Sequence, residues 1–263
     1  MDKERIPEFQ VVVDTPGWRG IKPRIPDTPQ RRELGKQRTI RELVFGFQDG
    51  ILTTLGIATG VAEAEGSHWV VVVSGLLALL SGALSMGVGA YLGAKAEREV
   101  VQATIDMERR EMEENPQDEF SEQVAYYKLK GFSSDEAHTI VSRLVKNPDI
   151  YLYEMIRDEF GIDPRIAEHN DVRGPLSIAL SFAIGALLPV LPYFFSWSGL
   201  TTAGASLALA IMGLFGIGYY AATLSGRNPW GKGAEIVCYG MAVFAISWAA
   251  GKFIPPIFGH PSQ

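Results

Sequence analysis

Three pairs of potential metal ligands stand at helical spacing in the middle of the sequence. They are Glu108 with Glu111, Glu119 with Glu122, and Met155 with Glu159. Residues three or four positions apart lie on one face of a helix, with Cβ atoms roughly 5–6 Å apart. If the helices that carry them fold back on one another, five carboxylates and one thioether converge at a single place.

Such a set of donors predicts a site for a divalent cation. Carboxylates bind hard and borderline ions, and a thioether shifts the preference from Mg²⁺ and Ca²⁺ toward softer metals. The set accepts Fe²⁺, Mn²⁺, Co²⁺ and Zn²⁺ alike, and no prosthetic group is expected. The sequence leaves one alternative open, a solvated acidic face with Met155 in a small hydrophobic core.

Helix signals around these residues indicate how they are positioned. Asn-Pro pairs at 115–116 and 147–148 each end one helix and start another, because proline suits the first position of a helix. Ser133 and Glu136 form a capping box at the start of a further helix. The expected helices are 95–114, which continues the preceding apolar segment, and 116–130, 133–146 and 148–160. No strand pattern competes, so the chain is predicted to be all-α.

Two apolar blocks flank this charged region. Residues 42–94 and 174–256 together contain only eight charged side chains. A soluble core has no use for apolar blocks of this length, so the composition excludes a simple globular enzyme and indicates a membrane protein. Turn residues divide the blocks into five segments, each long enough to cross about 30 Å of hydrocarbon. The segments are 43–62, 69–93, 175–195, 200–224 and 234–254.

The predicted domain organisation follows from this segregation of charge. The parts are a Pro-rich basic arm at 1–41, two transmembrane helices at 42–94, an acidic insert at 95–173 with 19 Asp/Glu against 11 Lys/Arg, three transmembrane helices at 174–256, and a tail at 257–263. The arm is interpreted as an extended segment near an anionic membrane face, with a plain disordered tail as the alternative.

Orientation is predicted from the positive-inside rule. With the N-terminus in the cytoplasm, 23 of the 24 Lys/Arg residues fall on the cytoplasmic side, and only Lys252 lies toward the outside. Five spans place the C-terminus outside. The membrane is expected to be a prokaryotic plasma membrane, with that of a vacuole-type organelle as the alternative. Nucleic acid is excluded as a partner because the basic residues of this acidic chain flank membrane spans.

The apolar segments themselves contain two candidate pathway residues. Asp49 lies in the first segment, and charges inside a membrane are costly and usually mark the path of an ion. The alternative is a hydrated aspartate near the cytoplasmic interface. Met86 lies in a glycine-rich part of the second segment, where it is either a soft transient ligand or a packing residue.

Signals for enzymatic chemistry are weak. The four histidines form no cluster, and no His-Glu-x-x-His motif occurs. A di-iron oxidase, which uses a Glu-x-x-His pair on each of two helices, is therefore disfavoured. The chain is predicted not to be an enzyme.

Two motifs resemble those of the vacuolar iron transporter (VIT) family. They are FGFQDG at 45–50 and SMGVGAYL at 85–92, followed by Lys95-x-Glu97 and the acidic helical insert. The resemblance covers roughly residues 39–256. It implies a homodimer of five-helix subunits, with a cytoplasmic metal-binding domain inserted between helices 2 and 3, that exports Fe²⁺ from the cytosol across the bilayer in exchange for protons.

The resemblance also implies roles for individual residues. The metal-binding domain of the family uses carboxylates and a methionine, which match the six residues paired above, and its membrane path uses an aspartate and a methionine, matched by Asp49 and Met86. One departure is Ala78, where the family commonly has a glutamate, and another is Thr53-Thr54, where it usually has proline and apolar residues. The loss of the glutamate supports an alternative function, a membrane-anchored sensor or buffer that binds iron without transporting it.

Overall fold

The described part of the chain is helical throughout. The computed structural model describes residues 29–65, 67–168, 172–195 and 199–257, and within these residues it contains eight α-helices, two short 3₁₀ helices and no strand. The chain divides into two compact units, an insert unit that includes residues 93–168 and a membrane unit that includes residues 29–92 and 172–257. The predicted all-α class is confirmed.

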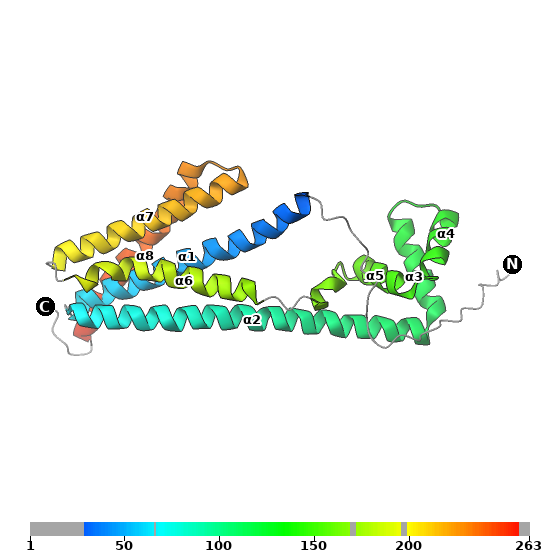
Figure 1. Cartoon of the computed structure of the whole chain (residues 1–263), viewed down its shortest axis with the longest axis horizontal. Coiled ribbons are helices and arrows are strands. Elements are labelled where there is room, and N and C mark those ends of the chain that lie inside the picture. Colours follow the sequence, from blue (N-terminus) through cyan, green and yellow to red (C-terminus); the bar gives the residue numbers. More distant parts are fainter. Residues whose placement is uncertain (1–28, 66, 169–171, 196–198, 258–263) are drawn as a thin grey trace. The chain divides into compact units, whose positions relative to one another are not determined.

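The helices of the membrane unit are the long ones in Figure 1. They are α1 (Pro29–Glu65), the first half of α2 (His68–Glu114), α6 (Arg173–Val190) with the 3₁₀ helix η2 (Leu191–Phe194), α7 (Gly199–Ser225) and α8 (Pro229–Ile257). Each contains a stretch that is long and apolar enough to cross a membrane, which confirms the five predicted spans. Helix α2 has 47 residues and is therefore roughly 70 Å long at 1.5 Å per residue, more than twice the thickness of the hydrocarbon.

The first helix starts earlier than predicted. Residues 29–41 were expected to belong to an extended arm, but α1 begins at Pro29 and continues without interruption into the apolar span. The prediction is wrong for these residues because no proline follows Pro29 in this stretch, and the Arg, Gln, Glu and Leu residues that do follow are good helix formers. Residues 1–28 and 258–263 lie outside the described part of the chain.

Helices α1 and α6 approach each other closely through glycine. A Cβ atom added at Gly50 would lie 2.2 Å from the carbonyl oxygen of Phe182, and one added at Gly185 would lie 2.1 Å from that of Phe47. Only glycine permits such an approach. The Ser181 hydroxyl adds a hydrogen bond across the same interface, donating to the Leu43 carbonyl at 2.5 Å. A small apolar core joins α1 to α7 and α8: Ile51, Leu55, Ala210, Leu214 and Ile236.

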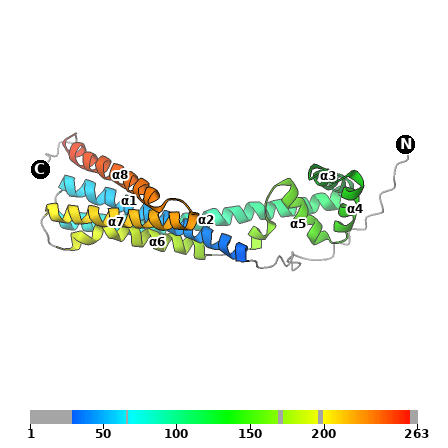
Figure 2. The same cartoon turned by 90° about the horizontal axis from the view of Figure 1, so that it is seen from above.

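The insert unit consists of the second half of α2 and four short helices. These are α3 (Pro116–Leu129), α4 (Ser134–Leu144), α5 (Pro148–Glu159) and the 3₁₀ helix η1 (Pro164–Glu168), and both views show the three α-helices gathered beside the end of α2 (Figures 1 and 2). The predicted capping box is present, since Ser133 accepts from the Glu136 amide and the Glu136 carboxylate accepts from the Ser133 amide. The predicted helices of the insert are confirmed to within two residues.

Candidate functional site

Three helices of the insert unit bring the predicted carboxylates together. We call Glu108, Glu111, Glu119, Glu122 and Glu159 the carboxylate cluster. The first pair lies near the end of α2 and the second in the first turns of α3, and Asn115 is the only residue between these helices. Its amide donates to the Glu111 carbonyl at 2.7 Å, so the chain turns directly from one pair to the next. Helix α5 contributes the fifth carboxylate at its C-terminal end.

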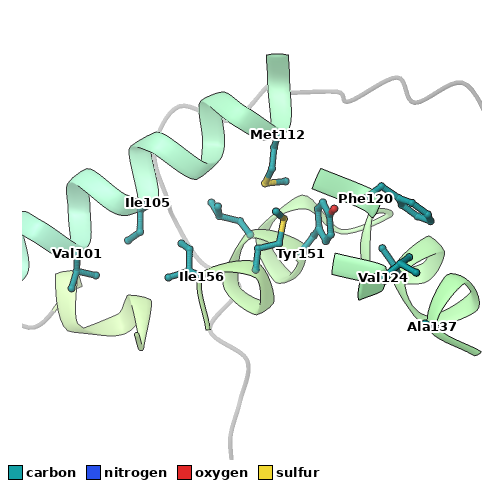
Figure 3. Packing of buried hydrophobic residues seen from close by; sticks show 11 residues of the cluster. Val101, Ile105, Met112, Phe120, Val124, Ala137, Tyr151 and Ile156 are labelled. Carbon is teal, nitrogen blue, oxygen red and sulfur yellow. The ribbon is translucent and has the colours of Figure 1, made fainter. Parts of the chain in front are cut away.

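A hydrophobic core holds the three helices in place. Its buried members come from α2, α3, α4 and α5: Val101, Ile105, Met112, Phe120, Val124, Ala137, Val141, Tyr151, Leu152, Met155 and Ile156. Figure 3 shows Ile105 and Met112 of α2 pointing toward Tyr151 and Ile156 of α5. Met155 is part of this core, as the alternative interpretation of the sequence predicted. The cluster nevertheless differs from a solvated acidic face, because some of its carboxylates are buried as well.

Burial divides the carboxylate cluster into an inner and an outer part. Glu108 is 0% exposed and Glu119 is 7% exposed. Glu111 is half-buried, whereas Glu122 and Glu159 are exposed. The cluster is thus open to solvent on one side and closed by the hydrophobic core on the other, an arrangement in which a cation can enter from water and meet desolvated ligands.

The five side chains influence one another electrostatically. Burial and, after it, the charges of Glu159, Glu119, Glu111 and Glu122, in this order, together raise the pKa of Glu108 to about 8. Desolvation and then repulsion by like charges are the two causes expected for a carboxyl group buried among other carboxylates.

The second buried carboxyl group behaves in the same way. Burial and, after it, the charges of Glu122, Glu111 and Glu159 together raise the pKa of Glu119 to about 7. The pKa of Glu159 is also raised, first by desolvation and then by Glu122 and Glu111. At neutral pH the inner carboxyl groups therefore retain protons that a cation can replace.

Glu108 has an unusual environment even within the cluster. Both of its carboxylate oxygens are buried, and neither has a hydrogen-bond partner among the described residues. A buried polar group without a partner costs about 1–3 kcal/mol, and a charged one costs more. Native proteins rarely leave such a group unsatisfied, so a buried carboxylate of this kind is suited to accept a proton or a cation.

The carboxylates of the cluster lie near one another, but they are not preassembled into a metal site. Within the described ranges, no three His, Cys, Asp or Glu side chains are close enough to form a ready group of metal ligands. Like charges repel, and this repulsion opposes closer approach of the carboxylates.

Two residues of this region were not predicted from the sequence to belong to the site. Tyr151 precedes Met155 by four residues and Glu159 by eight, so all three share one face of α5. Met112 follows Glu108 by four residues on α2 and is buried in the same core as Met155. The helical spacing was visible in the sequence, but neither an isolated tyrosine nor a second methionine is a distinctive signal for a metal site.

Asp49 lies in the membrane unit, where α1 contacts α6. It is half-buried, and its neighbour Gly50 packs against the Phe182 backbone. Gly46, three positions before Asp49, also contacts Phe182: a Cβ atom added at Gly46 would lie 3.2 Å from the amide nitrogen of Phe182. These contacts place Asp49 at the level of Phe182 along α6.

Met86 lies on α2, where this helix also contacts α6. It is half-buried. A Cβ added at Gly82, one helical turn before it, would lie 2.3 Å from the ring of Phe182, and one added at its neighbour Gly87 would lie 3.0 Å from the Cβ atom of Ala179. The two predicted pathway residues therefore lie beside the same helix, Asp49 near Phe182 and Met86 nearer Ala179.

The two positions that depart from the family pattern also lie in this unit. Thr54 is fully buried, and its hydroxyl donates to the Gly50 carbonyl at 2.8 Å. Ala78 is half-buried on α2 and contributes no polar atom from its side chain. Asp49 therefore stands without a second acid at the position where the family commonly has one.

A comparison with protein families explains this combination of spans and acidic insert. The profile of the VIT family matches residues 40–252, which include all five spans and the whole insert. The chain belongs to the VIT family. The resemblance inferred from the two motifs is confirmed.

Individual relatives match over most of their lengths. Vacuolar iron transporter 1 of Oryza sativa subsp. japonica is 28% identical over 85% of this chain and 88% of its own. The vacuolar iron transporter of Toxoplasma gondii is 30% identical over 84% of this chain and 76% of its own. Protein CCC1 of Saccharomyces cerevisiae is 28% identical over 82% of this chain and 69% of its own.

The names of these relatives bear on two further predictions. The relatives from Oryza sativa and Toxoplasma gondii are named as iron transporters, in agreement with the prediction that this VIT family member is not an enzyme. All three come from eukaryotes, and this gives no support to the expected prokaryotic plasma membrane. One Glu-x-x-His pair does occur, at Glu65 and His68, but α1 ends at the first residue and α2 begins at the second. The pair therefore lacks the single helix face that di-iron sites require.

Proposed function

We propose that this VIT family member transports divalent iron across a membrane, and that its insert unit is the cytoplasmic site that captures the ion. Family membership, the names of the relatives and the five apolar spans support transport. The observation that carries the capture site is Glu108, a fully buried carboxylate without a partner among the described residues, surrounded by four other carboxylates.

Capture proceeds by exchange of protons for the ion. The exposed Glu122 and Glu159 attract a hydrated cation, and the half-buried Glu111 draws it toward the inner carboxyl groups. Binding there expels the protons that the raised pKa values of Glu108 and Glu119 retain near neutral pH. The bound charge relieves the repulsion between the carboxylates, so the cluster contracts around the ion.

Met155 adds a thioether to this set of oxygen donors. It is buried in the core of the insert unit, one helical turn before Glu159 on α5. A thioether favours Fe²⁺ and other transition metals over Mg²⁺ and Ca²⁺. The site accepts Mn²⁺, Co²⁺ and Zn²⁺ for the same reason.

Asp49 and Met86 form the path through the membrane. Asp49 neutralises the partly dehydrated ion, and Met86 supplies a polarizable contact. The path lies between the first and second spans of two subunits of a homodimer. The ion leaves the cytosol and protons move in the opposite direction, with the N-terminus in the cytoplasm and the C-terminus outside.

A second candidate function is that of a sensor or buffer that binds iron and moves none. The observation in its favour is Ala78, which leaves Asp49 without the second acid that the family commonly has at this position. A transporter with this alanine would have to couple protons to metal without that second acid.

Reconstitution in liposomes separates these functions. Transport is followed with Fe²⁺ and with Mn²⁺ while the internal pH is recorded. We expect metal flux with a coupled pH change, and we expect Asp49→Asn to abolish both while metal binding persists. Glu63→Gln is the matched control, because it removes another acid of α1 that lies outside the Phe182 level. Binding without flux in the unmodified protein would establish the sensor, and flux retained in Asp49→Asn would remove that residue from the path.

A further inference from the structure

Tyr151 combines deep burial with an unsatisfied hydroxyl group. It is 4% exposed, and its hydroxyl oxygen is buried without a hydrogen-bond partner among the described residues. Phenylalanine offers the same ring for packing without the polar atom. Since an unsatisfied buried hydroxyl costs about 1–3 kcal/mol, packing alone gives no reason for a tyrosine at this position.

The inner carboxylates influence this hydroxyl. Burial raises the pKa of the Tyr151 phenol, and the charges of Glu119, Glu108 and Glu122 raise it further, in this order. Figure 3 shows the ring in the same core as Met112 of α2 and Phe120 of α3, the two helices that carry these carboxylates. The unsatisfied donor of Tyr151 and the unsatisfied acceptors of Glu108 therefore occur in one small region.

Ionised carboxylates are acceptors only, and this determines what the site lacks. A bound cation uses some of the carboxylate oxygens, and the remaining lone pairs need hydrogen-bond donors. Within the described part of the chain, no lysine or arginine reaches Glu108. The outer carboxylate Glu122 has a tyrosine donor, since the Tyr126 hydroxyl lies 3.5 Å from its oxygen. On the buried side, the Tyr151 hydroxyl is a donor that has no partner among the described residues.

We infer that Tyr151 is a positioning residue of the metal site, and that its hydroxyl donates a hydrogen bond to a ligating carboxylate, Glu119 or Glu108, when the cluster holds a divalent cation. The inference rests on the proposed capture function of the insert. The hydrogen bond fixes the orientation of the ligand without adding charge. Groups that orient metal ligands in this way typically contribute 10- to 100-fold to metal affinity.

Tyr151→Phe tests this role in the full-length protein in detergent, with Tyr153→Phe as the matched control. Tyr153 lies on the same helix and is also 4% exposed, but its ring faces Arg157 and Arg165 instead of the cluster. We expect Tyr151→Phe to weaken Mn²⁺ binding by about 10-fold in calorimetry and to leave the unfolding temperature of the metal-free protein unchanged or raised. Tyr153→Phe should bind Mn²⁺ like the unmodified protein.

The absorption spectrum of bound Co²⁺ distinguishes positioning from a purely structural role. We expect its bands to shift in Tyr151→Phe and to stay unchanged in Tyr153→Phe. If Tyr151→Phe binds Mn²⁺ with unaltered affinity and spectrum, the inference fails while the capture site stands. If it lowers the unfolding temperature of the metal-free protein, Tyr151 is a packing residue and the inference also fails. If the unmodified protein binds neither Mn²⁺ nor Co²⁺, the proposed capture function fails and the inference with it.

Discussion

The membrane unit and the insert unit are both built from helices, but they differ in how closely the helices pack and in how many charged groups they contain. In the membrane unit, α1 and α6 meet backbone to backbone at Gly50 and Gly185, and residues 42–92 and 174–256 contain only eight charged side chains. In the insert unit, a core of aliphatic and aromatic side chains separates the helices, and carboxylates such as Glu108 are buried at its border. The membrane unit brings helices close together with few charged groups, whereas the insert unit buries carboxyl groups that have no basic partner among the described residues and retain protons near neutral pH.

This difference assigns different physical tasks to the two units. A tightly packed, charge-poor contact between helices resists deformation, and this suits the proposed path, in which Asp49 must stay in place. An uncompensated group of carboxylates is destabilised until a cation arrives, and this suits a site that must respond to one. The comparison predicts that the membrane unit is sensitive to small changes in volume and the insert unit to changes in charge, pH and metal.

The largest expected effect comes from adding one methyl group to the membrane unit. Gly50→Ala places a Cβ atom 2.2 Å from the carbonyl oxygen of Phe182, and a backbone atom cannot move aside as a flexible side chain does. We expect a loss of about 3 kcal/mol, at the upper end of overpacking effects, and a loss of transport. Thermal unfolding in detergent measures it. Gly216→Ala on α7 is the control, because a Cβ there meets no atom within 4 Å. Equal stability of the two variants would contradict the tight α1–α6 contact.

The next effect concerns charge in the insert unit. Glu108→Gln combined with Glu111→Gln should weaken Mn²⁺ binding by about 100-fold, or about 2.8 kcal/mol, because two ligands lose their charge while the side-chain volume is retained. Isothermal titration calorimetry measures the affinity. Glu113→Gln with Glu114→Gln is the matched control, since it removes the same net charge from two exposed positions at the end of the same helix. If both double variants bind equally weakly, only net charge matters and the cluster is not a site.

The pH dependence of stability should differ in sign with and without metal. In the metal-free protein the pKa of Glu108 is about 8 and that of Glu119 about 7, above the value of 4.5 for an unperturbed glutamate. The folded insert therefore holds these protons more tightly than the unfolded chain does, and its stability falls as the pH rises from about 4.5 through about 8. We expect a loss of at least about 1.4 kcal/mol between pH 6 and pH 8, the equivalent of one pKa unit.

Hydrogen exchange of the amides in residues 116–159, corrected for the intrinsic effect of pH, follows this change within the insert. Saturating Mn²⁺ should reverse the trend, because binding requires the protons to leave and therefore strengthens as the pH rises. Glu108→Gln should flatten the metal-free profile. A metal-free insert that is more stable at pH 8 than at pH 6 would refute the raised pKa values.

The smallest expected effect concerns metal preference. Met155→Leu conserves volume, so stability should change by less than about 1.5 kcal/mol. Loss of the thioether should lower the affinity for Co²⁺ several-fold relative to Mg²⁺. Met112→Leu provides the comparison, because Met112 is buried in the same core but was not predicted as a ligand. An unchanged preference in Met155→Leu, with a changed one in Met112→Leu, would move the thioether ligand from α5 to α2.

Much of the fold was predictable because its causes are local. Five apolar segments follow from the hydrophobicity of about 20 consecutive residues, and the helices of the insert follow from Asn-Pro breaks and a capping box. The exception was residues 29–41, where the abundance of prolines before Pro29 obscured the helix-forming stretch after it. Helix signals also placed each pair of carboxylates on one face, because that depends only on the helical repeat.

By itself, the sequence determined which residues share a helix face, where the helices begin and end, and which segments are apolar enough to span a membrane. The tertiary structure alone decided that Glu108 is fully buried while Glu122 is exposed, and that the Tyr151 hydroxyl lacks a partner near the inner carboxylates. The physical reason is that helical periodicity depends on residues a few positions apart. Burial and electrostatic coupling depend on how α2, α3 and α5 pack, and these helices bring together side chains about 50 residues apart in the chain.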